Sequence, residues 1–225
     1  MNEKGVLYIV ATPIGNLGDI TLRALDVLRS VDVIACEDAR HTLKLLNHYE
    51  IKKHLVSLHA RNEKQATVKV LKVLEEGRSV AYVSDAGTPS VSDPGSILVQ
   101  ETREAGYGIV PVPGVSALVT LLSVAGSFGK AVHFEGFLSP KAGRRKKRLK
   151  ELIARDEAIL LYESPYRMVR LLTDIKEIDE SRQLIVGKEM TKVHENIITG
   201  SSSGVLDVFL EMGEVKGEFA VLIFP

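Results

Sequence analysis

The sequence predicts an α/β protein built as two domains, each on its own sheet. Its 225 residues are enough for one large α/β domain or two small ones. In the first half, short apolar runs alternate with helical patterns, which predicts a mostly parallel sheet covered by helices on both faces. The second half holds five strand-like runs but only three helical patterns, which predicts a mixed sheet.

The first domain is expected to span residues 1–127. Leu22, Leu25 and Leu28 recur at helical spacing before the second strand, and Val70 and Leu74 do so before the fourth. The strands of this domain are expected at residues 7–11, 32–36, 54–58, 80–84 and 109–112.

The second domain is expected to span residues 128–225, after a hinge bracketed by Gly126 and Gly129. The step between its third and fourth strands is short, which predicts a hairpin. The strands are expected at residues 132–137, 159–163, 184–188, 196–199 and 219–224, and the helices near 144–154, 165–176 and 204–212.

Composition and missing motifs exclude several classes of protein. Hydrophobic residues make up 45% of the chain and charged residues 26%, which excludes a disordered protein. The single cysteine, Cys36, excludes an internal disulfide and a cysteine-built zinc site, and no metal site is predicted. No dinucleotide, phosphate-loop or zinc-protease motif occurs, so nicotinamide chemistry, nucleotide hydrolysis and metal-dependent hydrolysis lose support.

The chain carries no recognisable targeting or membrane segment. Its first residues lack the basic region and the apolar run of a signal peptide. No run approaches the ~18 apolar residues that a membrane span needs. We therefore expect a cytoplasmic protein without a membrane partner.

The net charge of zero hides one dense basic segment, residues 141–150. Seven of the 29 Lys and Arg residues lie there with no acid, which leaves 22 basic against 29 acidic side chains elsewhere. Such a chain directs its positive field to one place, and a polyanion is the natural ligand. A solvated helix face is the alternative interpretation.

Four loops that follow predicted strands of the first domain have an unusual composition. They cover residues 12–19, 37–41, 84–95 and 113–117, and they are rich in Gly, Pro, Ser and acids. Any one of them could be a simple turn. All four are expected at the carboxyl edge of one parallel sheet, where ligands of open α/β sheets bind, and this favours a functional site.

These loops also carry a resemblance to a known family. The segments VATPIGNLGDITLRAL, ACEDARHTLKLL, SDAGTPSVSDPG, PVPGVSA, FEGFLSPK and YESPYR resemble the ribosomal RNA small-subunit methyltransferase I family of the tetrapyrrole methylase superfamily. The resemblance covers residues 5 to about 224. It implies two α/β domains with S-adenosylmethionine in the cleft between them, a homodimer, and 2′-O-methylation of a cytidine in 16S ribosomal RNA. Longer members carry a further C-terminal helical segment, whereas this sequence stops at Pro225.

Eight positions are expected to bind the cofactor. The resemblance implies an acid that contacts the cofactor at Asp85, while Gly87 and Thr88 would allow close backbone approach. Ser116 and Ala117 begin a predicted helix, where N–H groups can meet a carboxylate, although a simple helix cap is the alternative. Tyr162 and Met190 match by position the residues that close over the adenosine, with core packing as their alternative. The full set is Pro13, Asp85, Gly87, Thr88, Ser116, Ala117, Tyr162 and Met190.

The methyl acceptor is expected to meet the charged group after the second strand. Asp38 or His41 could accept the proton, and Arg40 could hold a phosphate. A surface salt-bridge cluster at a helix start is the alternative, and His59 and Tyr166 are further candidates for the base. The expected substrate contacts are Arg40, Lys141, Arg144, Arg145, Lys146 and Lys147. The last five are expected in a mobile loop that leads into a helix and is poorly ordered without RNA.

Two other functions remain open from the residues alone. The same fold could methylate a small anionic tetrapyrrole-like molecule, as relatives in the superfamily do. It could also serve as a non-catalytic RNA-binding factor, although four intact strand-end loops would then have no purpose. The basic segment favours RNA, or a small ribosomal subunit, over a compact substrate.

Overall fold

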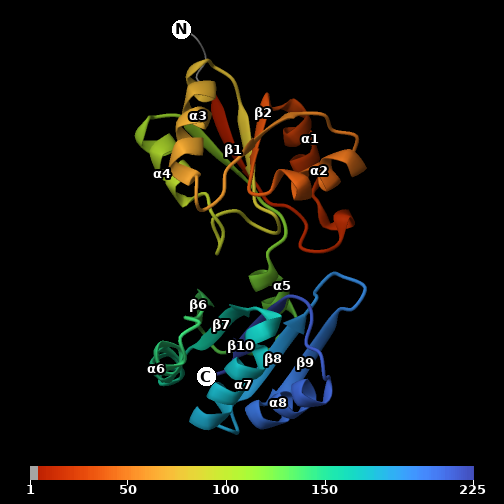
Figure 1. Ribbon diagram of the computed structural model, residues 1–225, viewed down its shortest axis with the longest axis vertical. Helices are drawn as coiled ribbons and strands as arrows, with labels where there is room; N and C mark the ends of the chain where they lie inside the picture. The colour runs from red at the N-terminus through yellow and green to blue at the C-terminus, as the bar shows by residue number, and fades with distance from the viewer. Residues whose placement is uncertain (1–4) are drawn as a thin grey trace. The chain divides into compact units, whose positions relative to one another are not determined.

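The computed structural model describes residues 5–225 and divides into two compact units, which meet in the sequence between Ser116 and Ala117 (Figure 1). The sequence pattern placed this division at 127/128. The difference is one helix, α5 (Ala117–Ser123), which contacts the strand β10 (Phe219–Ile223) of the second unit. No described helix is both long and apolar enough to cross a membrane.

The first unit is built on a five-stranded sheet in which every described pairing is parallel, as predicted. The strand order is β3-β2-β4-β1-β5. The central strands β2 and β4 are buried along their whole length, which explains their unbroken apolar sequence. The strands are β1 (Val6–Val10), β2 (Val33–Cys36), β3 (His54–Ser57), β4 (Val80–Val83) and β5 (Gly108–Val112), within two residues of the predicted bounds at each end.

Helices cover both faces of this sheet. One face packs on α1 and α2 through Leu28 and Leu46, and the other packs on α3 and α4 through Leu74 and Leu98. Figure 1 shows the pairs α1/α2 and α3/α4 on opposite sides of β1 and β2. The helices are α1 (Leu22–Ser30), α2 (Ala39–His48), α3 (Glu63–Glu75) and α4 (Ser96–Glu104).

At the centre of the sheet, the helices that follow two neighbouring strands lie on opposite faces of the sheet. β1 and β4 lie side by side, yet β1 continues into α1 on one face and β4 into α4 on the other. Ligands of open α/β sheets bind at such a switch point, outside the carboxyl ends of the strands. The loops after β1 and β4 therefore frame the expected site.

The second unit is built on a mixed sheet, which confirms the predicted fold class. Its strand order is β6-β7-β10-β8-β9, with β6 parallel to β7 and the other pairings antiparallel. The pair β8/β9 is the predicted hairpin. The strands are β6 (Val132–Phe137), β7 (Ala158–Glu163), β8 (Gln183–Lys188), β9 (Asn196–Ser201) and β10, all close to the predicted ranges.

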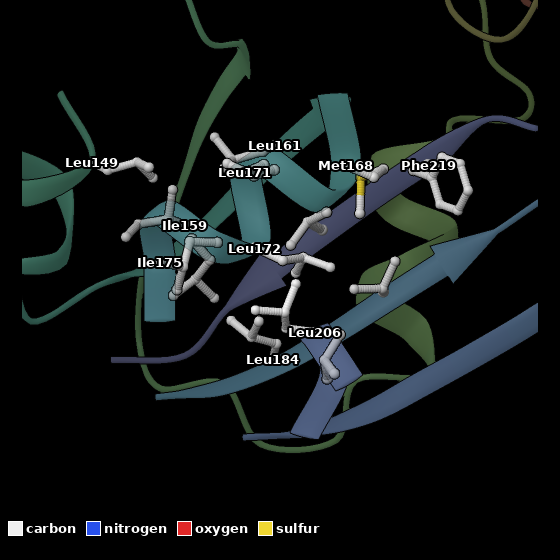
Figure 2. Packing of buried hydrophobic residues seen from close by; sticks show 14 of the residues in the cluster. Leu149, Ile159, Leu161, Met168, Leu171, Leu172, Ile175, Leu184, Leu206 and Phe219 are labelled. Carbon is white, nitrogen blue, oxygen red and sulfur yellow. The ribbon is translucent and has the colours of Figure 1, made fainter. Parts of the chain in front are cut away.

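Three helices pack on one face of this sheet, and their contacts form the core of the second unit. They are α6 (Ala142–Ile153), α7 (Pro165–Ile178) and α8 (Ser202–Glu211). Figure 2 shows Leu171 of α7 close to Leu161 of β7, and Leu172 and Ile175 of α7 on the side of Leu184 of β8. Because these side chains are fully or almost fully buried, α7 is fixed to the sheet along its length.

The basic segment is ordered differently from the prediction. It is helical from Ala142, and Arg145 lies buried with its Nε 2.6 Å from Asp174 Oδ2 on α7. Lys146 bonds Glu177 at 2.6 Å. The prediction of a mobile, poorly ordered loop was wrong. Acids from other elements neutralise part of the positive charge of the segment, and this lowers the repulsion between its cations.

Candidate functional site

The loops after β1 and β4 are joined by a short backbone bridge. Thr12 N–H donates to Gly87 O at 2.9 Å, and Gly87 N–H donates to Thr12 O at 3.0 Å. The Thr12 hydroxyl also donates to Ser84 O at 3.2 Å. This bridge places Pro13, which is buried, beside the loop that carries Asp85 and Gly87.

Two more hydrogen bonds attach the remaining loops to this centre. Asp38 N–H donates to Asp85 Oδ1 at 3.0 Å, which ties the loop after β2 to the loop after β4. The Thr88 hydroxyl donates to Val115 O at 3.1 Å, which ties in the loop after β5. All four loops singled out from the sequence therefore meet at one edge of the first sheet.

The loop after β4 is held in an uncommon backbone conformation. Ser90 and Ser92 both have positive φ angles, of 67° and 68°, which non-glycine residues rarely adopt. At Gly87, with φ 76°, a Cβ would lie 3.3 Å from Ile14 Cγ2. Such conformations cost about 1–3 kcal/mol each and persist where the surroundings enforce them, often at binding sites.

A buried carboxylate fixes the far end of the same loop. Glu63, the first residue of α3, is 8% exposed, and its Oε1 accepts hydrogen bonds from Gly95 N–H and Ile97 N–H, each at 2.9 Å. It thereby caps α4, whose own N-cap residue is a glycine without a side chain. The sequence analysis missed Glu63, because nothing local marks a carboxylate that caps a different helix.

Acidic side chains gather where the loops meet. Burial, with the charge of Asp85 as a smaller cause, raises the pKa of Asp93 to about 6. Burial and the charges of Asp85 and Asp93 also raise the pKa of Glu37. Both shifts come mainly from burial, which penalises the charged carboxylate, and a cationic ligand would favour the charged form. Asp93 belongs to the segment SDAGTPSVSDPG and was identifiable from it, but it was not selected.

The predicted acceptor group after β2 forms the start of α2, a helix that the sequence analysis did not assign. Asp38 is its N-cap and accepts from Arg40 N–H at 2.8 Å, while the Arg40 guanidinium pairs with the same carboxylate at 2.8 Å. These bonds lower the pKa of Asp38 to about 2. His41 lies exposed in the first turn, and His59 lies after β3, its N–H bonded to Asn62. The arrangement matches the salt-bridge alternative for Asp38 and Arg40.

The cofactor candidates Tyr162 and Met190 belong to the second unit and are described within it. Tyr162 is the last residue but one of β7, its hydroxyl accepts from Leu118 N–H at 3.0 Å, and its ring meets Phe134 and Phe137 edge-on. Ala117 begins α5 directly after Ser116, so this bond ties Tyr162 to the first turn of that helix. Tyr166 is 89% exposed at the start of α7.

Met190 occupies a tight turn after β8. It is 7% exposed, and a Cβ on Gly187 would lie 2.6 Å from its sulfur, so the thioether packs directly against this glycine and would have to shift for any larger residue. Its neighbours Glu189 and Thr191 have positive φ angles, and the Thr191 hydroxyl is buried without a hydrogen-bond partner within the described chain. A strained turn with an unsatisfied polar atom is typical of a ligand-contacting loop.

Comparison with known proteins decides the family. The family described as Tetrapyrrole (Corrin/Porphyrin) Methylases matches residues 6–205. A ribosomal RNA small subunit methyltransferase I of Borrelia garinii subsp. bavariensis is 46% identical over 97% of this chain and 98% of its own length. The chain belongs to the ribosomal RNA small subunit methyltransferase I family. The family member of Escherichia coli O157:H7 is 45% identical over 99% of this chain and 78% of its own length. The resemblance drawn from the motifs is thus confirmed.

Solved structures share the fold at low sequence identity. The methyltransferase CobJ superposes with a TM-score of 0.73 at 20% identity, covering 98% of this chain and 94% of that one. The cobalt precorrin-4 methyltransferase CbiF superposes with a TM-score of 0.71 at 19% identity, covering 97% and 94%. A uroporphyrin-III C-methyltransferase from Thermus thermophilus, complexed with S-adenyl homocysteine, gives 0.67 at 17%, covering 97% of each chain.

The residues present fit S-adenosylmethionine, the methyl donor of this family. That molecule carries a sulfonium and an ammonium, which need carboxylate or carbonyl partners, and a ribose diol, which needs acceptors. The acids Glu37, Asp85 and Asp93 provide carboxylate oxygens at the loop junction, where burial raises the pKa of Glu37 and of Asp93. Gly87 adopts its φ of 76° without the strain that a side chain would add, which allows the bridge to Thr12 at this junction.

Proposed function

We propose that this protein transfers a methyl group from S-adenosylmethionine to the ribose 2′-hydroxyl of a cytidine in 16S ribosomal RNA, in the cytoplasm. Its relatives at 40–46% identity over nearly the whole chain are ribosomal RNA small subunit methyltransferases I, which supports the substrate class. The junction of four strand-end loops around an acid cluster is the structural observation that carries the proposal.

In this proposal the first unit binds the charged parts of the cofactor. Asp85 is the best-placed partner for a cationic or hydroxyl group, because its second carboxylate oxygen makes no hydrogen bond within the described chain. Pro13, Gly87 and Thr88 line the same junction, and Ser116 and Ala117 follow the loop after β5. Tyr162 and Met190 of the second unit are proposed to contact the adenosine.

Methyl transfer from a sulfonium depends more on alignment than on a strong base. When bound, the cofactor supplies an electrophilic methyl group; the sulfur–methyl bond breaks as the oxygen–methyl bond forms, and the hydroxyl proton must leave. Asp38 is a weak proton acceptor, since its pKa is about 2 and Arg40 holds its carboxylate. We therefore propose His41, exposed beside it, as the acceptor, with Asp38 and Arg40 positioning the first turn of α2.

The acid cluster predicts how cofactor binding depends on pH. Asp93 has a pKa of about 6, so the cluster gains a negative charge as the pH rises through 6. S-adenosylmethionine, a sulfonium cation, should therefore bind roughly three- to tenfold more tightly at pH 7.5 than at pH 5. Calorimetry with S-adenosylhomocysteine, whose thioether is neutral, is the matched control and should show a smaller change. This expectation would be contradicted if the affinities for both ligands depended equally on pH. It would also be contradicted if the affinity of Asp93→Asn for S-adenosylmethionine still changed between pH 5 and pH 7.5 as in the parent.

The function itself is tested by transfer of a labelled methyl group to 16S RNA, both as free RNA and in assembled small subunits. We expect incorporation at one cytidine, with the modified nucleoside resistant to alkaline cleavage of the adjacent phosphodiester. Incorporation into a tetrapyrrole instead would support the small-substrate alternative. RNA binding without any transfer would support the non-catalytic alternative.

We further propose that the protein is a homodimer, as the family resemblance implies. Val119 and Val124, in and just after α5, are more than half exposed and provide apolar surface for an interface. Sedimentation at micromolar concentration should give about twice the mass of one chain, and a monomer would contradict the proposal.

A further inference from the structure

The cations of the basic segment divide into two groups that the sequence alone does not separate. Arg145 pairs with Asp174, Lys146 with Glu177, and Arg148 bonds Glu135 at 2.7 Å. These pairs attach α6 to α7 and to β6. These three cations are already neutralised by acids of the second unit and are poorly suited to bind an external anion. We therefore no longer propose Arg145 and Lys146 as RNA contacts.

The other four cations are exposed and carry no ion pair within residues 5–225. They are Lys141, Arg144, Lys147 and Lys150. Lys141 is the N-cap residue of α6, and Arg144, Lys147 and Lys150 lie three residues apart within the helix, so that each is a neighbour of the next on its surface. The three helical side chains spread over about a third of the circumference, since three residues turn the helix by about 300°. The single acid of α6, Glu151, bonds Arg148 at 3.3 Å and so leaves this row unneutralised.

We propose that this row, the α6 basic face, binds the phosphates of the RNA substrate. The inference rests on the proposed function and assigns the surface that holds the RNA backbone. From Lys141 to Lys150 the helix rises about 13 Å, at ~1.5 Å per residue. A nucleic-acid strand carries one phosphate per about 3.4 Å of duplex axis, so a patch of this length spans several phosphates of one strand.

The paired cations make this face rigid. Arg145 and Asp174 side chains are each 5% exposed, so the helix cannot rotate about its axis without burying an unpaired charge. Phosphate contacts position an RNA without reading its bases, and a helix fixed on both sides by ion pairs gives such contacts a defined register. A small anion would use one or two of these cations, whereas a patch of four cations along the helix matches a polyanion.

The test compares two triple variants that remove the same charge. Arg144→Gln, Lys147→Gln and Lys150→Gln neutralise the α6 basic face. Lys64→Gln, Lys69→Gln and Lys72→Gln neutralise three cations of α3 that are also exposed and without an ion pair in the described part of the chain. Binding of transcribed 16S RNA is measured by fluorescence anisotropy across a salt titration, beside calorimetry with S-adenosylmethionine and thermal unfolding.

For the α6 triple we expect roughly ten- to a hundred-fold weaker RNA binding at 0.1 M salt. The slope of log affinity against log salt should shrink by about two to three, because each phosphate contact contributes about 0.7–0.9. Cofactor affinity and unfolding should not change, and the charge-preserving triple Arg144→Lys, Lys147→Arg and Lys150→Arg should bind like the parent. The α3 triple should have little effect.

Three outcomes overturn the inference. If the α6 triple variant binds RNA like the parent, the α6 basic face does not bind RNA. If both triple variants lose affinity equally, the loss reflects the net charge of the protein and not the α6 basic face. Loss of binding in the charge-preserving triple would show that folding or shape, not charge, was measured. If the parent methylates RNA and the α6 triple variant binds RNA normally, only this inference is wrong. If the parent neither binds nor methylates RNA, the proposed function is wrong as well.

Discussion

Replacing Asp85 with alanine is expected to weaken S-adenosylmethionine binding ten- to a hundred-fold. A hydrogen bond to a charged group contributes about 1.5–3 kcal/mol, which corresponds to that range of affinity. Asp85 also accepts the Asp38 N–H, so the variant additionally loosens the loop after β2 from the loop after β4. Calorimetry on the folded variant measures the effect.

Two further variants separate these contributions. Asp85→Asn keeps an oxygen to accept the Asp38 N–H but removes the charge, so its affinity should lie between those of the parent and Asp85→Ala. Asp26→Ala removes a carboxylate from the exposed face of α1, 78% exposed, and should leave affinity unchanged. An Asp85→Ala protein that is folded and binds the cofactor like the parent would remove Asp85 from the site.

Replacing Arg145 with alanine is expected to destabilise the second unit by about 3–5 kcal/mol. The change leaves the Asp174 carboxylate, 5% exposed, with only the Nζ of Lys146 at 3.5 Å as a cationic partner. Breaking a buried ion pair from one side costs this much because the remaining charge is still out of water. Urea unfolding, followed by a probe in the second unit, gives the difference in free energy.

The neighbouring Lys147 provides the matched control. It is exposed, and Lys147→Ala should change the free energy of unfolding by less than about 0.5 kcal/mol. The double variant Arg145→Met and Asp174→Leu should recover much of the loss, since an apolar pair of similar volume often replaces a buried ion pair without cost. An Arg145→Ala protein as stable as the parent would show that this pair does not anchor α6.

The strands were predictable from the sequence because each is a compact apolar run between turn residues. Buried strands such as β2 and β4 must be apolar on both faces, and that requirement is visible locally. Helix α2 was not assigned, because its first turn is the charged group Asp38-Ala39-Arg40-His41, which was interpreted as a loop with a helix start only as the alternative. Its buried residues Leu45 and Leu46 lie next to one another and give a weak helical pattern.

The position of the site was predictable, but its electrostatics were not. Parallel strands deliver their following loops to one edge, so the meeting of four loops follows from the fold class. The raised pKa values of Glu37 and Asp93 come mainly from burial and, to a smaller extent, from the nearby charge of Asp85, and only the folded loops determine both. In the same way, a run of basic residues in the sequence does not show that Asp174 of α7 and Glu135 of β6 form ion pairs with it in the fold.

The place of β10 in the second sheet has a consequence for how the chain acquires its structure. β10 spans residues 219–223 and lies between β7 and β8, pairing with both. Before it arrives, β6 with β7 and β8 with β9 are two separate ladders, each with one open apolar edge. During synthesis these edges stay exposed until residue 223 has left the ribosome, and open apolar edges favour aggregation. Slow translation past β8 should therefore lower the soluble yield, and a chaperone that covers strand edges should restore it.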